Sequence, residues 1–386
     1  MRWIKLLAIV AALLVVATTG WAQPSKVKVG FIYVGPIGDF GWTNAHDVAR
    51  KKLERAFPGQ VETMYVESVP EGNAEPFIDK LVRGGANVVF TTSFGFMDGT
   101  LAAAKRHPDV IFAHASGFKR NDNMATYMAD FYQLYYLNGL MAGALTKTNR
   151  IAYVGAFPIP EVKRHLGAFA LGVRAVNPRA TVHVRWLFSW FDPAKAKEAT
   201  EALLAERADV FAFTEDSPTV IQVAAQKNRT SFSHYSPMQR FAPRHVISGQ
   251  LVHWDRIYID FIGKVLKGTY SNQNLESVDY WWLLAEKAVE LGGQFGQPIN
   301  PRFTGQLKAA RVRTTEFGTI SVYDLVNRRL AQMARKPVAF DPFTGPIRDR
   351  KGVVRVPAGH TMTIGELNSM EWAAPGIVGQ WPKEPK

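Results

Sequence analysis

A strand–loop–helix pattern opens the chain near residue 27 and begins again at residue 150, and this repetition constrains the fold more than any other feature. The first copy has a strand rich in β-branched and aromatic residues at 27–34, a loop with Gly and Pro, and a helix with apolar residues four apart. The second copy has a strand at 150–155, a loop with two prolines and another helix. The predicted fold class is therefore α/β, with two lobes of similar plan.

Short apolar strands alternate with helices through both halves. The further strands expected are 86–91, 110–115, 182–187 and 208–213, and the further helices are 98–106, 193–206 and 218–227. This alternation is typical of parallel sheets with helices on both faces. Ligands of such sheets bind at the carboxyl ends of the strands, so a cleft between the two lobes is the expected functional site.

The first 22 residues have the pattern of a secretory signal peptide. Arg2 and Lys5 precede an apolar run from Leu6 to Ala17, and small residues follow the run. A dozen apolar residues are fewer than the roughly 20 that span a bilayer, so a membrane anchor is the less favoured alternative. The mature protein is expected to begin near Gln23 and to be periplasmic.

Composition limits the chemistry of the mature chain. It has no cysteine, which excludes a lipid-modified Cys, a disulfide, a Cys-ligated zinc and a thiol nucleophile. Loss of Arg2 and Lys5 lowers the formal net charge from +13 to +11. Because the Lys and Arg are scattered and form no basic run with interleaved aromatics, no nucleic-acid partner is expected. The excess of positive charge is interpreted as a solubility feature or as a source of attraction to anionic surfaces.

Residues 131–146 are apolar almost all round and contain Gly139 and Gly143, a spacing found in paired membrane helices. Sixteen residues that include Gln133 and Asn138 are too short and too polar for a membrane span. The segment is predicted to be a buried helix that contacts a neighbouring backbone.

Sequence signatures of enzymes are weak. Residues 39–41 spell the metal-binding tripeptide of protein kinases without the other kinase motifs, and the glycines of 35–41 miss the dinucleotide and phosphate-loop spacings. Neither a His-Glu-x-x-His nor a Gly-x-Ser-x-Gly motif occurs. His114 and Ser116 lie close in sequence, but nothing supplies an acid to orient the histidine. Neither catalysis, nor a cofactor, nor a metal is expected.

The loop after the first strand, residues 35–44, carries the most informative side chains. Asp39, Trp42 and Asn44 together could recognise a flat heteroaromatic ring by stacking and hydrogen bonding. Stacking of a base on an aromatic side chain is worth about 1–3 kcal/mol. An equally consistent interpretation is that Thr43 or Asn44 caps the following helix and Trp42 packs beneath it.

Other loops on the cleft side add aromatic and acidic residues. The candidate ligand contacts are Phe94, Phe96, Asp130, Trp190, Phe191 and Asp216. Taken singly, each is more often a helix cap or a core anchor than a ligand contact. Together they favour an aromatic-walled polar pocket.

Six short blocks, in order along the chain, resemble the basic membrane protein family of ABC-transporter solute-binding proteins, which includes purine-nucleoside receptors. The blocks lie at 38–42, 95–98, 136–143, 192–199, 343–347 and 370–372. The resemblance covers nearly the whole mature chain. It implies an ABC permease as partner and a monomeric state.

The resemblance also implies two Rossmann-like lobes of the periplasmic binding protein type I, joined by a three-segment hinge. The first lobe would comprise 25–117 and 248–276, and the second 118–247 and 277–345. The remaining tail, 346–386, is rich in Pro, Gly and charge and is expected to wrap over the lobes.

The family's base-gripping Asp and aromatic residue correspond to Asp39 and Trp42. Where the family has a Phe-Asn pair, this chain has Trp42 and Thr43, so an amide contact would pass to Asn44 or be lost. Nucleoside-binding members also carry an acidic stretch after the last strand of the second lobe.

At that acidic stretch this chain has His234 and Tyr235 as candidate contacts instead. Loss of the carboxylate removes a charge-assisted acceptor for a ribose diol, which favours a free base such as adenine over a nucleoside. The purine would stack on Trp42 and on Trp190 or Phe191, and lobe closure would bury it. The alternatives are another small solute such as a sugar or an amino acid, a periplasmic nucleoside hydrolase, and a sensory role.

Overall fold

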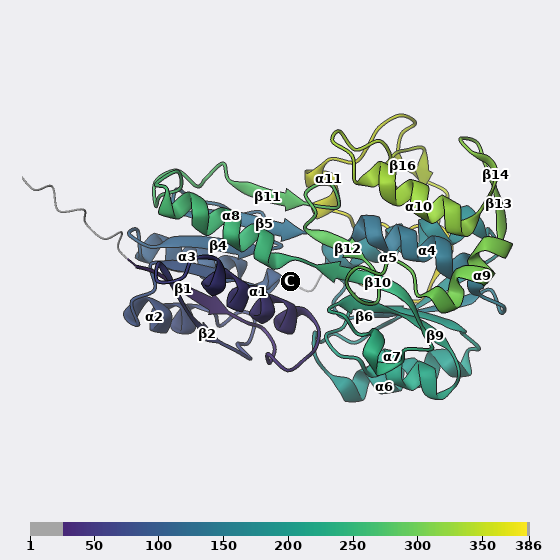
Figure 1. Ribbon diagram of the computed structural model, residues 1–386, viewed down its shortest axis with the longest axis horizontal. Coiled ribbons are helices and arrows are strands. Elements are labelled where there is room, and N and C mark those ends of the chain that lie inside the picture. Colours follow the sequence, from purple (N-terminus) through teal and green to yellow (C-terminus); the bar gives the residue numbers. More distant parts are fainter. Residues whose placement is uncertain (1–25, 384–386) are drawn as a thin grey trace, which may run out of the picture.

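The computed structural model describes residues 26–383, which form two α/β lobes lying end to end (Figure 1). One lobe contains a six-stranded sheet in the order β11-β5-β4-β3-β1-β2, and the other a seven-stranded sheet in the order β12-β10-β9-β8-β6-β7-β17. All strand pairs in both sheets are parallel except β10 with β12. The predicted α/β class is confirmed. The predicted signal peptide lies outside the described residues.

The first lobe is built around β1, β3 and β4, whose residues are nearly all buried. Its strands are β1 (Val27–Ile32), β2 (Val61–Val66), β3 (Val88–Thr91), β4 (Ile111–Ala115), β5 (Met124–Ala129) and β11 (Asp279–Trp282). Its helices are α1 (Trp42–Ala56), α2 (Glu75–Arg83), α3 (Met97–Arg106) and α8 (Trp254–Leu266), with a 3-10 turn, η1 (Phe94–Phe96).

The second lobe repeats this plan around β6, β8 and β9. Its strands are β6 (Arg150–Gly155), β7 (Thr181–Trp186), β8 (Val210–Phe213), β9 (Thr230–Tyr235), β10 (Val246–Val252), β12 (Val289–Leu291) and β17 (Ile377–Val378). Its helices are α4 (Tyr132–Leu145), α5 (Pro160–Val176), α6 (Pro193–Ala205), α7 (Thr219–Gln226), α9 (Pro301–Ala309), α10 (Val322–Met333) and α11 (Ile364–Asn368), with a 3-10 turn, η2 (Gln239–Phe241). Two small hairpins are attached, β13 (Arg311–Thr314) with β14 (Gly318–Ser321) and β15 (Ile347–Arg348) with β16 (Val354–Val356).

Strand pairing moves three strands across the lobe boundaries that the sequence predicts. β5 and β11 extend the first sheet beside β4, although the sequence assigns 118–247 and 277–345 to the second lobe. β10 pairs with β9 in the second sheet, although 248–276 is expected in the first lobe. These boundaries came from the family resemblance, and none of the three strands was among those expected from the sequence. Pairing with a neighbouring strand decides which lobe each one joins.

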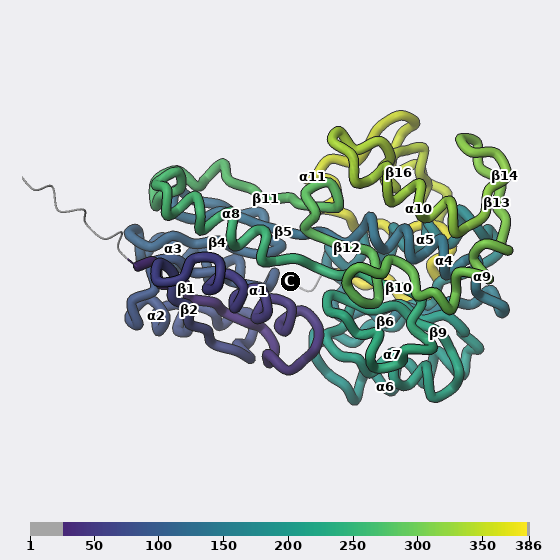
Figure 2. Tube along the Cα trace, in the orientation of Figure 1, coloured from purple at the N-terminus to yellow at the C-terminus, as the bar shows by residue number. Residues whose placement is uncertain are grey.

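The chain crosses between the lobes three times, after β5, after β10 and after β11 (Figure 2). The crossings fall near residues 130–131, 253 and 283–288. Three crossing segments agree with the hinge that the family resemblance implies. The described part of the predicted tail joins the second lobe, because β17 pairs with the edge strand β7 and α11 packs against α5.

The predicted buried helix is α4, which packs against α5 at backbone contact distance. A Cβ atom added to Gly139 would lie 2.2 Å from the carbonyl oxygen of Phe169, and one added to Gly172 would lie 2.1 Å from that of Tyr136. Glycine is therefore required on both helices. Within the described residues, no helix combines the length and apolarity needed to cross a membrane.

Replacing Gly139 by Ala tests this helix contact. The added methyl group would force α4 and α5 apart, and we expect the free energy of unfolding to fall by roughly 1–3 kcal/mol. Gly305→Ala is the matched control, because a Cβ atom there meets nothing within 4 Å and α9 should gain up to about 1 kcal/mol. Urea unfolding followed by circular dichroism measures both. Equal stability of the two variants would contradict the contact.

Candidate ligand-binding cleft

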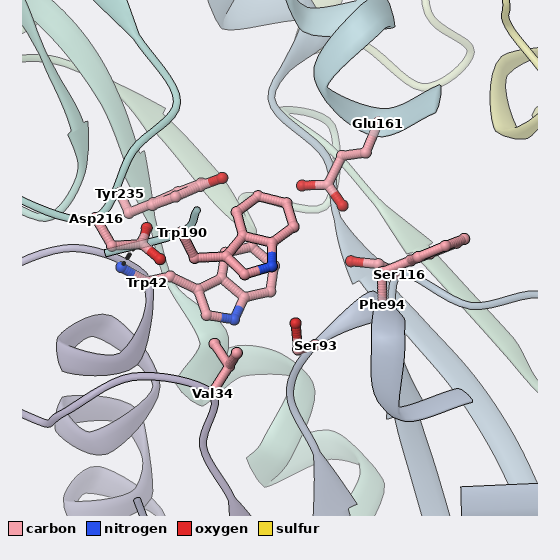
Figure 3. Close-up of a pocket in the computed structure, with 9 residues that line it drawn as sticks. All are labelled: Val34, Trp42, Ser93, Phe94, Ser116, Glu161, Trp190, Asp216 and Tyr235. Atoms are coloured by element: carbon pink, nitrogen blue, oxygen red, sulfur yellow. Dashed lines mark hydrogen bonds between the residues drawn. The ribbon is translucent and has the colours of Figure 1, made fainter. Parts of the chain in front are cut away.

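A cavity lies between the lobes where the carboxyl ends of the two sheets face each other (Figure 3). Its empty space is about 270 Å³. The first lobe contributes Val34, Trp42, Ser93, Phe94 and Ser116, and the second contributes Glu161, Trp190, Asp216 and Tyr235. These residues follow or end β1, β3 and β4 in one lobe and β6, β7, β8 and β9 in the other. The cavity thus occupies the place where open parallel sheets bind ligands.

Five of the candidate residues chosen from the sequence line this cavity: Trp42, Phe94, Trp190, Asp216 and Tyr235. Four of them are aromatic, which gives the cavity walls large apolar faces. Stacked contacts of this kind suit a flat or ring-shaped ligand.

Trp42 is held firmly at the start of α1. Its ring makes edge contacts with His46 at 4.8 Å, Tyr235 at 5.0 Å and Trp254 at 5.1 Å between centroids. Its indole N–H donates to the backbone oxygen of Thr92. Trp254 itself is fully buried and stacks on His46, so it packs the core and does not line the cavity.

Asp39, Thr43 and Asn44 organise the first loop. The Asp39 carboxylate accepts backbone N–H groups from Gly41 at 2.8 Å, Asn44 at 2.9 Å and Thr43 at 3.0 Å. Thr43 accepts the N–H of Gly35, and the Asn44 amide donates to the backbone oxygen of Ile37. None of the three side chains lines the cavity. The interpretation of Thr43 or Asn44 as the helix cap is wrong, because α1 begins at Trp42 with Gly41 as its N-cap and the Asp39 carboxylate accepts the N–H groups there.

The other four candidates also lie away from the cavity lining. Phe96 is fully buried in the core of the first lobe, whereas Phe191 is 37 % exposed. His234 is buried, with Nδ1 2.9 Å from the Tyr135 hydroxyl, and burial lowers its pKa well below the ordinary value. Asp130 sits at the first crossing between the lobes.

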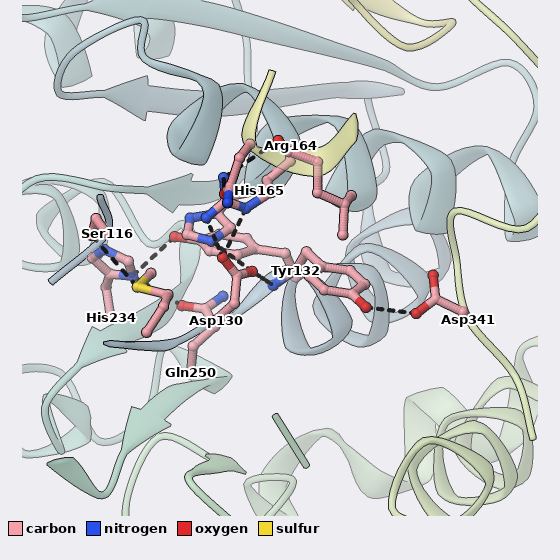
Figure 4. A network of polar contacts seen from close by, with 12 residues as sticks. Ser116, Asp130, Tyr132, Arg164, His165, His234, Gln250 and Asp341 are labelled. Carbon is pink, nitrogen blue, oxygen red and sulfur yellow. Dashed lines mark hydrogen bonds and ion pairs between the residues drawn. The ribbon is translucent and has the colours of Figure 1, made fainter. Parts of the chain in front are cut away.

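Asp130 is the centre of a buried polar network at this crossing (Figure 4). Its carboxylate accepts from Arg164 Nε at 2.7 Å, lies 3.2 Å from His165 Nε2 and accepts the N–H of Tyr132 at 3.0 Å. Burial opposes ionisation, but Arg164 and then His165 hold the pKa of Asp130 well below its usual range. The Arg164 guanidinium also lies 5.1 Å over Trp281, so Trp281 packs at the hinge.

The sequence missed Val34, Ser93, Ser116 and Glu161 as lining residues. Glu161 is the important omission, because its buried carboxyl faces the cavity from the first turn of α5 (Figure 3). The repeat itself contained the signal. Glu161 follows the first strand of the second lobe, as Asp39 and Trp42 follow that of the first lobe.

Two lining residues have strained backbones. Ser116 has φ of 63° and Tyr235 has φ of 61°, in the left-handed region that costs a non-glycine residue of order 1–3 kcal/mol. Both residues lie where a strand ends, β4 for Ser116 and β9 for Tyr235. Such strain is concentrated at binding sites, where the fold fixes a side chain in place.

The cavity lining carries two carboxyl groups and neither lysine nor arginine. Burial raises the pKa of Glu161, and the charges of His165 and Arg164 oppose this rise. Burial also raises the pKa of Asp216 well above its ordinary value, and the nearby charges of Asp39 and Glu215 add to the effect. One Asp216 oxygen, Oδ2, is buried without a hydrogen-bond partner. This oxygen is therefore free to accept a hydrogen bond from a ligand.

The lobes touch directly at the first loop, which defines a closed arrangement. Asp216 Oδ1 accepts the backbone N–H of Trp42 at 3.3 Å, and the Ser236 hydroxyl donates to the backbone oxygen of Gly41 at 3.2 Å. A Cβ atom on Gly41 would lie 2.7 Å from the Asp216 Cα. At the cleft edge, the guanidinium of Arg240 lies 4.9 Å over the ring of Phe40.

Two similar lobes, three crossing segments and a cavity between them define the two-lobed fold of the periplasmic binding protein type I. Solved structures with this fold include solute-binding proteins from Aeropyrum pernix and Conexibacter woesei. The first has a TM-score of 0.66 at 17% identity and covers 80% of this chain and 91% of its own. The second has a TM-score of 0.60 at 20% identity and covers 82% and 100%.

The chain belongs to the PnrA-like family of ABC transporter substrate-binding proteins, whose profile matches residues 26–308. A purine-binding protein of Brucella abortus is 37% identical over 93% of this chain and 95% of its own length. A putative ABC transporter glucose-binding protein of Haloferax volcanii is 35% identical over 76% of this chain and 74% of its own. A small-molecule ligand and an ABC permease are thus the partners that the family implies.

The buried carboxyls predict a pH dependence of stability. Burial raises the pKa of Asp39 to about 6, although three backbone N–H groups oppose the rise, and Asp216 is raised further. A raised pKa means that the folded protein binds the proton more tightly than the unfolded chain. The resulting stability is present below pH 4 and is lost as the pH rises through 6.

Asp216→Asn should reduce the loss of folding stability that accompanies a rise in pH, because the amide cannot ionise. We expect the stability of the ligand-free variant relative to the wild type to rise as the pH increases from about 3.5 to 7.5, because only the wild type must ionise or keep a buried carboxyl protonated. Urea unfolding at a series of pH values measures the difference. Glu201→Gln, which changes an exposed carboxyl of the same lobe, is the control and should give a constant difference. A constant difference for Asp216→Asn as well would contradict the interpretation.

Proposed function

We propose that the protein captures a purine in the periplasm and delivers it to an ABC permease, with a free base such as adenine favoured over a nucleoside. The observation that carries the proposal is the lining of the cavity. It combines four aromatic side chains with two buried carboxyl groups and has neither lysine nor arginine.

A purine complements this lining in two ways. Its flat ring can stack on the aromatic walls, for which each stacked contact is worth about 1–3 kcal/mol. Its ring and exocyclic N–H groups can donate to the carboxyl of Glu161 and to Oδ2 of Asp216, which has no hydrogen-bond partner in the closed protein. Ligands with a carboxylate or a phosphate would face two carboxyls and no guanidinium, which argues against amino acids and nucleotides.

The volume of the cavity supports a small ligand. Its empty space in the closed arrangement is only about 270 Å³, and part of that space is open to solvent. Glu161 and Asp216 could also accept hydrogen bonds from a ribose diol, so the absence of an acid at His234 and Tyr235 is the weaker reason for preferring a base. Size is the stronger one.

The two relatives point in different directions. The Brucella abortus relative is named for purine binding, and it matches nearly the full length of this chain. The Haloferax volcanii relative is named for glucose binding, and sugars also use aromatic faces and carboxylates. Glucose is therefore the second candidate ligand.

We propose capture without chemistry by a monomer. The lobes would close about the three crossing segments and bury the ligand, and the permease would recognise the closed form. Ser93 and Ser116 supply the serine hydroxyl groups of the lining, and the lining places no histidine beside them to act as a base.

Calorimetric titration of refolded, ligand-free protein tests the ligand class. Adenine, guanine, hypoxanthine, adenosine, guanosine and glucose are compared. We expect a base to bind most tightly and the matching nucleoside much more weakly, because the closed cavity is small. Tight nucleoside binding would support a purine ligand but contradict the preference for a free base. Binding of glucose alone would reject the purine proposal.

Glu161→Gln tests the role of the carboxyl that faces the cavity. Loss of a charge-assisted acceptor should weaken adenine binding by about tenfold or more, while the unfolding midpoint of the ligand-free protein should not fall, because burial raises the pKa of Glu161. Titration calorimetry measures the affinity, and Glu201→Gln is the control for loss of a carboxylate on the same lobe. Unchanged adenine affinity in Glu161→Gln would show that Glu161 is not a ligand contact.

A further inference from the structure

Glu71 is a half-buried residue of the first lobe, on the loop between β2 and α2, and does not itself line the cavity. Its Oε1 atom accepts the backbone N–H of Gly95 at 2.9 Å and the hydroxyl of Ser93. Its Oε2 atom accepts the indole N–H of Trp190 at 3.0 Å. Trp190 belongs to the second lobe, so one carboxylate bonds to both sides of the cleft.

On its own lobe, Glu71 fixes the segment that carries Ser93 and Phe94. Both residues line the cavity, and Gly95 follows them. A Cβ atom on Gly95 would lie 2.5 Å from the Glu71 carboxyl carbon, so the close approach depends on a glycine at that position. The carboxylate therefore determines where this part of the wall sits.

Across the cleft, Glu71 fixes Trp190. The Trp190 ring packs on Phe157 at 5.1 Å between centroids, and the Trp190 backbone oxygen accepts the N–H of Asp216 at 2.8 Å. By holding Trp190 in place, Glu71 also helps to fix the backbone of Asp216, which lines the cavity as well. Because an indole has a single donor and no acceptor, the bond to Glu71 leaves only the ring surface for a ligand.

We propose that Glu71 is a positioning residue for ligand capture, which sets affinity by joining the two walls of the cavity when the lobes close. This inference rests on the proposed function only in that the ligand binds in this cavity. The bond from Trp190 joins residues of different lobes and can form only after closure. Its loss should therefore accelerate ligand release and leave association nearly unchanged.

A double-mutant cycle isolates this bond. Glu71→Gln removes the charged acceptor, and Trp190→Phe removes the indole N–H but keeps an aromatic ring. Stopped-flow measurements with adenine should show about tenfold faster release in each variant, with association within about twofold of wild type. The double variant should release adenine no faster than either single variant, because both changes remove the same bond.

Glu62→Gln is the matched control, since Glu62 is an exposed carboxyl of the same lobe that pairs with Lys26. It should leave the release rate unchanged. Additive effects of Glu71→Gln and Trp190→Phe would overturn the proposal, because Glu71 would then act elsewhere. An unchanged release rate in Glu71→Gln would overturn it as well.

Spin labels measure closure independently of affinity. The chain has no cysteine, so Lys80→Cys on α2 and Gln222→Cys on α7 place one label on the exposed surface of each lobe. With saturating adenine, Glu71→Gln should shift part of the distance distribution towards the open form. Trp190→Phe should produce the same shift.

The same labels separate failure of this proposal from failure of the proposed function. A wild-type protein that neither binds adenine nor changes its label distances on adding adenine would reject the purine ligand. The ligand-free distributions then decide the role of Glu71. A smaller closed fraction in Glu71→Gln than in wild type would support the proposal, and identical distributions would overturn it.

Discussion

The buried contact of Asp130 with Arg164 and His165 is the interaction on which the rest of the structure depends. It anchors the first crossing segment to α5 of the second lobe, so it determines where the chain leaves one lobe and enters the other. The same helix carries Glu161 into the cavity, one turn before Arg164 and His165. These two side chains also oppose the rise in the pKa of Glu161. Hinge and cavity thus share one helix and its charges.

Much of the fold could be predicted from the sequence because its signals are local. The alternation of strands and helices gave the two lobes, and the polar residues inside 131–146 correctly favoured a buried helix over a membrane span. Lobe boundaries could not be predicted in this way, because β5, β10 and β11 were not among the strands expected from the sequence. Their membership depends on which neighbour completes their hydrogen bonds.

The aromatic residues of the site could be predicted from the sequence. Trp42, Phe94, Trp190 and Tyr235 follow or end strands, and the topology brings such positions to one edge of each sheet. The acidic residues of the site were harder to predict. Asp39 has the expected position but directs its carboxylate at its own loop, whereas Glu161 lies in a helix turn that no loop motif marked. Only the two-lobed symmetry would have identified it.

The strand β17 has a consequence for how the second lobe is completed. It covers the hydrogen-bonding edge of β7, yet it comes from residues 377–378, near the end of the chain. Until those residues arrive, β7 presents unpaired backbone groups that could recruit another chain. Completion of this sheet therefore requires residues far along the chain from β7, and residues 377–378 protect this part of the lobe against edge-to-edge association.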